Sequence, residues 1–306
     1  MLMAKAAAGT MDNLGTDAYE KQANLGQITE MIHVARSSFR AVSVPCLYCV
    51  RAVDSATILY CSPLSLIHDD VLDEADTRRG GEAVHKMYSN KVAVLAGDYL
   101  LARASVLLAK LENVDVVQIM ASALDSLVQG EIMQIKSTPG EALEMSYYLR
   151  KSYYKTASLI CYACKSCAIL GGHSVESELA VSAERFGYHF GLAYQIIDDI
   201  LDFTADSADL GKPAMADVEL GLATAPILYA SEECRELQPL IKRRFKEDGD
   251  PLKAYELVMT TSGVARSENL AIFHADSALL ALEAFPPSEA KDALKKLTEI
   301  VLTRKS

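Results

Sequence analysis

The chain has 306 residues, half of them hydrophobic, and a formal net charge of −11. This length is enough for one large domain or two of ordinary size. The negative charge argues against a nucleic acid as partner, because a duplex-binding protein needs a basic surface.

Sparse Gly and Pro, with many Ala, Leu, Ile and Glu in the second half, favour helices over strands, so we expect an all-α fold. The charge-free stretches 41–50 and 55–68 are shorter than the roughly 20 apolar residues of a membrane span, and no transmembrane segment is expected. Residues 1–15 show neither a signal-peptide core nor a clear transit-peptide pattern.

The N-terminal part of the chain changes character twice. Residues 1–26 are weakly patterned, whereas Gln27 to Ala35 places apolar residues at helical spacing and predicts a helix. Arg36 to Leu64 is rich in serine, cysteine and β-branched residues. Ser62-Pro63 then suits a helix start, with the serine as cap and the proline in the first turn.

A cluster of carboxylates follows and runs into two arginines and a glycine. In a helix, Asp69, Asp70 and Asp73 of this first aspartate cluster share one face. Like charges on one face repel, and convergent carboxylates suit a hard cation such as Mg²⁺. A solvated surface helix can also carry three aspartates, so this cluster alone leaves both interpretations open.

The same Asp-Asp-x-x-Asp spacing recurs in a second aspartate cluster, Asp198, Asp199 and Asp202, within an apolar run. Burial of three carboxylates there is costly without charge compensation. Two matched clusters therefore favour a metal site over a solvated surface. Gln195 precedes Asp198 by three residues and Asp199 by four, so we expect it to face the same cavity.

Periodicity and breaker residues predict the remaining elements. A loop is expected at 80–90, helices at 91–110, 114–136, 142–170 and 174–203, a loop at 204–226, and then three or four helices with breaks near 249–251, 263 and 286–287. Gly97 and Gly130 lie inside predicted helices, where glycine costs about 1 kcal/mol relative to alanine, so we expect them to mark close helix contacts.

The seven cysteines show no zinc-type spacing. Cys161, Cys164 and Cys167 recur every third residue in an apolar segment, which favours small buried residues in a reduced compartment over a redox or zinc role.

Several short motifs, in order and spacing, resemble those of the trans-isoprenyl diphosphate synthases, most closely the long-chain members that make quinone side chains. Besides the two aspartate clusters, they are Arg78-Arg79-Gly80, Ala93 to Asp98, Gln129-Gly130-Glu131, Tyr154 to Ile160 and Gly211-Lys212. The resemblance covers about Ser65 to the C-terminus, with a short piece before it. It implies an isoprenoid-synthase-type helical bundle around a central cavity, as a single domain over 27–306.

The resemblance implies a prenyltransferase that condenses isopentenyl diphosphate with an allylic diphosphate, giving a long trans-polyprenyl diphosphate by Mg²⁺-assisted ionisation. The implied metal ligands are Asp69, Asp70, Asp73, Asp198, Asp199 and Asp202, and the implied catalytic set is Asp69, Asp70, Asp73, Asp198, Asp199 and Lys155.

The family also implies residues that bind the two substrates. Arg78, Lys155 and Lys212 would hold the allylic diphosphate, and Arg79 the isopentenyl diphosphate. Gln195 and Thr156 complete the substrate-binding set, with a structural role for Thr156 as the alternative. Ser65, one turn before Asp69, is small and fits a long product.

Two departures from the family stand out. Segments like 27–35 and 65–73 form one continuous helix in the family, so 36–64 is an unusual insertion. A retained intron or gene-model error is the favoured hypothesis, and a genuine functional insertion the alternative. The upstream Gly-Lys-x-x-Arg-Pro motif has no match, so we expect the first helices and part of the isopentenyl diphosphate site to be missing.

These departures keep other functions open. The nearest alternative is an inactive or regulatory subunit of a heteromeric synthase, which the missing upstream motif supports. A metal-dependent terpene cyclase normally has an Asn/Asp-x-x-x-Ser/Thr-x-x-x-Glu-like motif in place of a second aspartate cluster. The family implies a homodimer, with a heteromeric assembly as the alternative. The family also suggests a plastid or a mitochondrion, although the sequence leaves compartment, product length and primer open.

Overall fold

The structure is a computed structural model that describes residues 21, 71, 77–78, 81–204 and 215–304. The first aspartate cluster, Ser65, Arg79 and Lys212 lie outside the described residues, as do the predicted helix at 27–35 and the insertion at 36–64.

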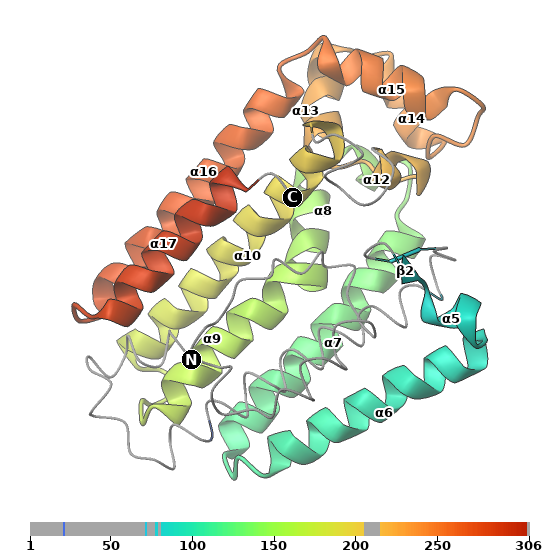
Figure 1. Ribbon diagram of the computed structural model, residues 1–306. Helices are drawn as coiled ribbons and strands as arrows, with labels where there is room; N and C mark the ends of the chain where they lie inside the picture. The colour runs from blue at the N-terminus through green and yellow to red at the C-terminus, as the bar shows by residue number, and fades with distance from the viewer. Residues whose placement is uncertain (1–20, 22–70, 72–76, 79–80, 205–214, 305–306) are drawn as a thin grey trace.

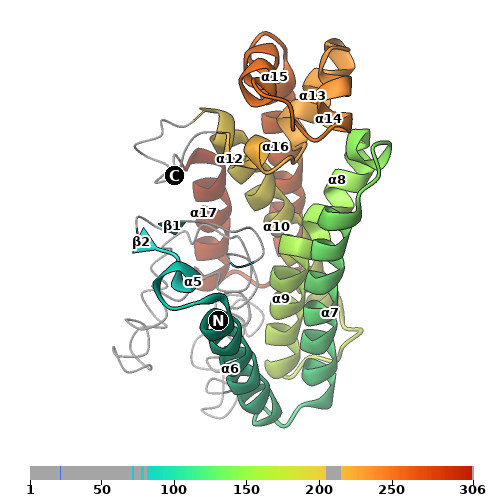
Figure 2. The same ribbon diagram turned by 90° about the vertical axis from the view of Figure 1, so that its right-hand side faces the viewer.

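Long helices run side by side and build the molecule, which confirms the predicted all-α fold (Figure 1). They are α6 (Asn90–Ala109), α7 (Val114–Lys136), α9 (Ser158–Leu170), α10 (Glu178–Thr204), α16 (Gly263–Ala281) and α17 (Glu289–Thr303). Helix α10 lies between α9 and α16, whereas α6 diverges from α7 at one end (Figure 2).

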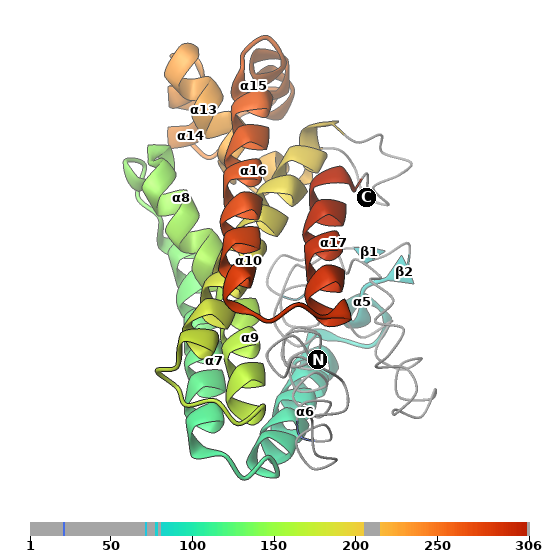
Figure 3. The same cartoon turned by 90° about the vertical axis from the view of Figure 1, so that its left-hand side faces the viewer.

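Shorter helices complete the bundle. They are α5 (Val84–Met87), η2 (Glu141–Leu143), α8 (Met145–Ser152), α12 (Ala216–Glu219), α13 (Ala225–Glu233), α14 (Leu237–Lys242), α15 (Asp250–Met259) and η4 (Leu282–Ala284). Helices α13, α14 and α15 gather at one end of the bundle (Figure 3). Within the described chain, the one sheet is a two-strand pair of β1 (Thr77–Arg78) and β2 (Gly81–Glu82), which are antiparallel with Arg78 opposite Gly81.

Side-chain caps explain why the predicted limits of the helices at 91–110 and 114–136 hold to within one residue. The Ser89 hydroxyl accepts a hydrogen bond from the Val92 N–H at 3.3 Å, and the Asn113 side chain accepts one from the Val116 N–H at 3.1 Å. Each cap satisfies a backbone donor that the first helical turn leaves without a partner.

The single helix predicted at 142–170 is wrong in two respects. The Glu141 carboxylate accepts a hydrogen bond from the Thr138 N–H at 2.9 Å, and the Thr138 hydroxyl accepts one from the Glu141 N–H. These reciprocal bonds stabilise a separate 3-10 turn. Glu144 is extended, and the α-helix begins only at Met145. A π-helix, η3 (Tyr153–Ala157), then separates α8 from α9.

Three other predicted limits also needed correction. The helix predicted at 174–203 begins at Glu178, because the Ser177 hydroxyl accepts from the Ala180 N–H at 3.2 Å. The predicted loop at 80–90 contains β2 and α5, and the one at 204–226 contains α12 and the start of α13. Residues 225–304 form five α-helices, one more than the three or four predicted, because Cys234 is extended and separates α13 from α14.

Close helix contacts surround η3. A Cβ on Gly130 of α7 would lie 2.7 Å from the Lys155 backbone nitrogen, and one on Gly191 of α10 would lie 2.6 Å from the Ala157 Cα. Such distances are too short for any side chain, so glycine allows α7 and α10 to approach η3. The predicted close contact at Gly130 is confirmed. Gly97 is buried in α6, and its contact stays a prediction.

The cysteines of α9 behave as the sequence indicates. Cys161 and Cys167 are buried and Cys164 is half-buried, and all three are free thiols. Burial raises the pKa of Cys164 to about 12 and also raises that of Cys161, so both stay protonated at neutral pH.

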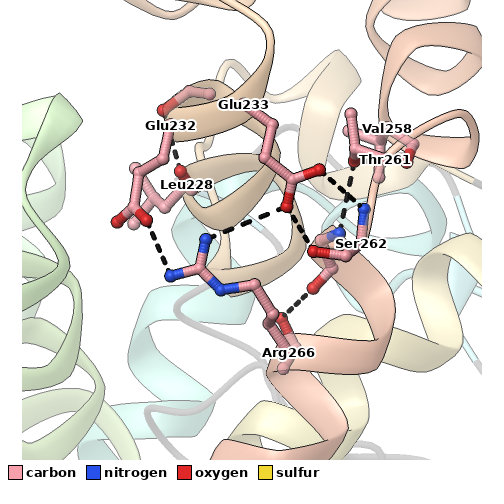
Figure 4. Close-up of polar contacts among 10 residues, drawn as sticks. Leu228, Glu232, Glu233, Val258, Thr261, Ser262 and Arg266 are labelled. Atoms are coloured by element: carbon pink, nitrogen blue, oxygen red, sulfur yellow. Dashed lines mark hydrogen bonds and ion pairs between the residues drawn. The ribbon is translucent and has the colours of Figure 1, made fainter.

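A polar cluster joins the end of α13 to the start of α16 (Figure 4). The Glu233 carboxylate accepts from the Ser262 backbone N–H at 3.1 Å and from the Ser262 hydroxyl. Arg266 pairs with Glu232 at 2.6 Å and lies over the Tyr229 ring. Glu233 therefore caps α16 from a neighbouring helix.

Helix α6 combines length with an exposed apolar face. By length and composition alone, α6 could cross a membrane. Of its most apolar stretch of 18 residues, 22% is buried in the bundle. This test is weak evidence and does not establish a membrane segment. Val92, Leu95, Tyr99 and Val106 are among its exposed residues.

Candidate functional site

The π-helix η3 carries two of the predicted substrate-binding residues, Lys155 and Thr156. Its wider turn is marked by the Ser158 N–H, which bonds the Tyr153 carbonyl five residues earlier. Single π-turns inside α-helices frequently occur at functional sites, because they re-aim side chains.

The Lys155 ammonium is held by α7. It lies 2.9 Å from a Glu131 carboxylate oxygen and 3.2 Å from the Gln134 side-chain oxygen. Its side chain is 15% exposed, so this ion pair is mostly shielded from water. Glu131 belongs to the Gln129-Gly130-Glu131 motif, and the contact links two motifs that are distant in sequence.

A chain of hydrogen bonds leads from η3 to the second aspartate cluster. The Thr156 hydroxyl donates to the Gln195 side-chain oxygen at 2.7 Å, and the Gln195 amide donates to Asp199 Oδ1 at 2.8 Å. The Tyr148 hydroxyl of α8 donates to Asp199 Oδ2 at 2.6 Å. Gln195 thus contacts the aspartates, in agreement with its spacing.

Burial makes the charge of Asp199 costly. The side chain is 3% exposed, and burial raises the pKa of its carboxyl well above the usual range, with the nearby Asp217 carboxylate as a second cause. Lys151 lies one turn before Lys155, and burial lowers the pKa of its ammonium. Burial therefore disfavours the charged form of both groups, and a cation bound beside Asp199 would stabilise its ionised carboxylate.

The other two aspartates of the cluster have different partners. Asp198 Oδ1 accepts from Arg304 Nη2 at 3.2 Å, and the same nitrogen donates to the Tyr194 carbonyl at 3.0 Å. The Arg304 guanidinium lies 3.8 Å above the Tyr194 ring. Asp202, also buried, accepts from the Asp217 backbone N–H at 3.2 Å.

Arg304 keeps further hydrogen-bonding capacity. Its side chain is 5% exposed, and its Nε and Nη1 atoms are buried with no hydrogen-bond partner in the part of the chain that the structure describes. Buried donors of this kind are costly unless an acceptor reaches them. The guanidinium therefore adds a cationic group beside Asp198.

The donor chemistry of the second aspartate cluster fits a hard divalent cation. Its carboxylate oxygens, with Asp217 nearby, are the ligands that Mg²⁺ prefers. Within the described ranges, no three Asp, Glu, His or Cys side chains converge closely enough to form a complete metal site. The first aspartate cluster, predicted to supply the opposing ligands, lies outside those ranges.

The structure therefore brings together Lys155, Thr156, Gln195 and the second aspartate cluster. For Arg78, the structure describes only the backbone, which lies in β1. Sequence reasoning missed Tyr148, Asp217 and Arg304. None of the three carries a sequence signal, because η3 interrupts the regular helical spacing between Tyr148 and Lys155, and Asp217 and Arg304 lie far along the chain from their partners.

Comparisons with known proteins agree with this architecture. The model of the polyprenyl synthetase family matches residues 55–258. Solanesyl-diphosphate synthase 1, mitochondrial, of Oryza sativa subsp. japonica is 41% identical over 302 residues, which cover 97% of this chain and 63% of that protein. Decaprenyl-diphosphate synthase of Dictyostelium discoideum is 41% identical over 304 residues, which cover 99% of this chain and 58% of that protein. The chain thus spans about three-fifths of the length of these curated relatives.

Solved structures show the same arrangement. The apo form of an Arabidopsis medium/long-chain length prenyl pyrophosphate synthase has a TM-score of 0.76 and 36% identity, covering all of this chain and 87% of that one. A polyprenyl synthase from Caulobacter crescentus CB15, complexed with calcium and isoprenyl diphosphate, has a TM-score of 0.73 and 26% identity. The match covers 100% of this chain and 93% of that one.

Proposed function

Because the chain belongs to the polyprenyl synthetase family, we propose that it is a prenyltransferase that extends an allylic diphosphate with isopentenyl diphosphate to a long trans-polyprenyl diphosphate. One observation carries the proposal: Thr156, which follows Lys155 in η3, connects through Gln195 of α10 to Asp199 of the second aspartate cluster. The names of the rice and Dictyostelium relatives support a long product and a role in quinone biosynthesis.

The second aspartate cluster, with the predicted Asp69, Asp70 and Asp73, would hold Mg²⁺. When bound, such a cation acts as a Lewis acid and neutralises the leaving diphosphate. The Caulobacter relative, solved in complex with calcium and isoprenyl diphosphate, supports the use of a divalent cation.

The basic residues would bind the diphosphates. The Lys155 ammonium is mostly shielded from water, which strengthens a bond to a phosphate oxygen. Arg78 and Lys212 would complete the allylic diphosphate site, and Arg79 would bind isopentenyl diphosphate. Gln195, anchored by Thr156, would orient Asp199 and the substrate. Ser65 would leave room for a long product.

We also propose a homodimer that forms through α6. Val92, Leu95 and Tyr99 recur at helical spacing and are 45%, 58% and 64% exposed, so α6 presents an apolar stripe of the kind that subunit interfaces cover. Light scattering on the purified chain tests this proposal, and a monomer would contradict it. The same measurement after addition of another synthase subunit tests the heteromeric alternative, which a mixed complex would favour. The rice relative is mitochondrial by name, which supports an organelle as the compartment.

The decisive assay measures incorporation of radiolabelled isopentenyl diphosphate with Mg²⁺ and an allylic primer, using the chain as given and a version without Arg36 to Leu64. We expect long prenyl products that require both substrates. A hydrocarbon formed from the allylic diphosphate alone would identify a cyclase. Activity only after addition of a second synthase subunit would identify a regulatory subunit, and no incorporation by either version would overturn the proposal.

A further inference from the structure

The hydroxyl of Tyr148 makes a short hydrogen bond to the second aspartate cluster. It donates to Asp199 Oδ2 at 2.6 Å, and both side chains are 3% exposed. A tyrosine hydroxyl is protonated at neutral pH, so it is the donor in this bond. When a bound cation keeps the carboxylate ionised, the bond becomes charge-assisted and stronger than one between neutral groups.

Packing holds the Tyr148 ring in place. The ring belongs to a buried hydrophobic cluster that also contains Ile200 of α10 and Leu228 of α13. Because residues of two other helices pack in this cluster, the position of the Tyr148 hydroxyl is set by the bundle and not by a flexible side chain.

The hydroxyl completes the support of Asp199 from two sides. Gln195 donates to the opposite oxygen, Oδ1, at 2.8 Å, and Thr156 in turn fixes the Gln195 amide. With one donor on each oxygen, the carboxylate plane cannot rotate freely, yet each oxygen keeps a lone pair for a cation.

We propose that Tyr148 is a positioning residue that fixes the Asp199 carboxylate in the orientation needed to bind a divalent cation. This inference rests on the proposed role of Asp199 as a metal ligand. Partners that orient a metal ligand typically change metal affinity by about 10- to 100-fold when they are removed.

The neighbouring tyrosine is a matched control. Tyr147 is 8% exposed, and its hydroxyl donates to the Met133 carbonyl at 2.7 Å, away from the aspartates. Tyr147→Phe and Tyr148→Phe therefore each remove one buried hydroxyl from the same helix, and only the second changes the support of Asp199.

The test measures Mn²⁺ binding by electron paramagnetic resonance, in the presence of inorganic pyrophosphate, on the full chain. We expect Tyr148→Phe to weaken Mn²⁺ binding by about 10- to 100-fold and Tyr147→Phe by less than about twofold. Equal Mn²⁺ affinity in the two variants, or no Mn²⁺ binding by the wild-type chain, overturns the inference.

Further variants separate positioning from a general loss of structure. In an Asp199→Asn background, Tyr148→Phe should cause no additional loss of Mn²⁺ affinity, because the oriented carboxylate is already gone. If Tyr148→Phe does not fold, Thr156→Val releases Gln195 from the other side and should weaken Mn²⁺ binding in the same direction; unchanged affinity would then contradict the inference.

The outcomes for function and for positioning are distinguishable. Suppose that the wild-type chain elongates prenyl chains, and that Tyr148→Phe and Tyr147→Phe need the same Mg²⁺ concentration for half-maximal rate. This result refutes only the role of Tyr148. A wild-type chain that binds Mn²⁺ through Asp199 but does not elongate refutes only the proposed function.

Discussion

At the scale of single residues, the site is governed by how buried charges are compensated. Asp199 depends on two neutral donors, Asp198 on Arg304, and Lys155 on Glu131 and Gln134. Neutral donors place no positive charge beside Asp199, whereas the ion pair of Lys155 balances two charges. We therefore expect the aspartate end of the site to attract cations and Lys155 to exchange its partner for a diphosphate.

Lys155→Met tests this exchange. Loss of a charge-assisted bond to a phosphate oxygen should raise the KM for the allylic diphosphate by about 10- to 100-fold, since such bonds contribute roughly 1.5–3 kcal/mol. Lys165→Met is the control, because Lys165 is 14% exposed and pairs with Glu184 at 2.7 Å outside the site. Initial-rate kinetics that find equal KM values in both variants would contradict the assignment.

At the scale of elements, two glycines let α7 and α10 approach the π-helix η3. Because Gly130 and Gly191 face the backbone of η3 directly, the position of Lys155 depends on these contacts as much as on its own helix. The sequence predicted the close contact at Gly130 from the cost of glycine in a helix, but it did not predict η3, since nothing in Tyr153 to Ala157 departs from an ordinary helical pattern.

Gly191→Ala should destabilise the chain by about 1–3 kcal/mol, because a Cβ 2.6 Å from the Ala157 Cα forces the backbones apart. Gly140→Ala is the control, since a Cβ there meets nothing within 4 Å. Urea unfolding measures both changes. If the two variants lose equal stability, the contact with η3 is not what requires glycine at position 191.

At the scale of the whole molecule, α10 is the central helix, and its contact with α16 contains a pair of histidines. His189 Nδ1 and His274 Nδ1 are 3.0 Å apart, so one ring donates to the other. Burial, with His189 as a second cause, lowers the pKa of His274 from 6.5 to about 4, and burial also lowers that of His189. The folded bundle therefore favours neutral rings.

This pair should make stability depend on pH. Between about pH 6.5 and pH 4 the unfolded chain binds more protons than the folded one, so the free energy of unfolding should fall as the pH falls through this range. His274→Asn should flatten this part of the profile relative to that of the wild-type chain. Urea unfolding from pH 7.5 to pH 4.5 provides the measurement, and parallel profiles would contradict the prediction.

The sequence by itself determined the helical class, the limits of α6 and α7, and the spacing that places Gln195 beside Asp199. These features depend on periodicity and on caps within one turn, which a local stretch of sequence contains. Only the tertiary structure decided that Tyr148 and Arg304 meet the second aspartate cluster, because 51 residues separate Tyr148 from Asp199 and 106 separate Arg304 from Asp198. Their approach results from how α8 and α17 pack against α10, and no local pattern records that packing.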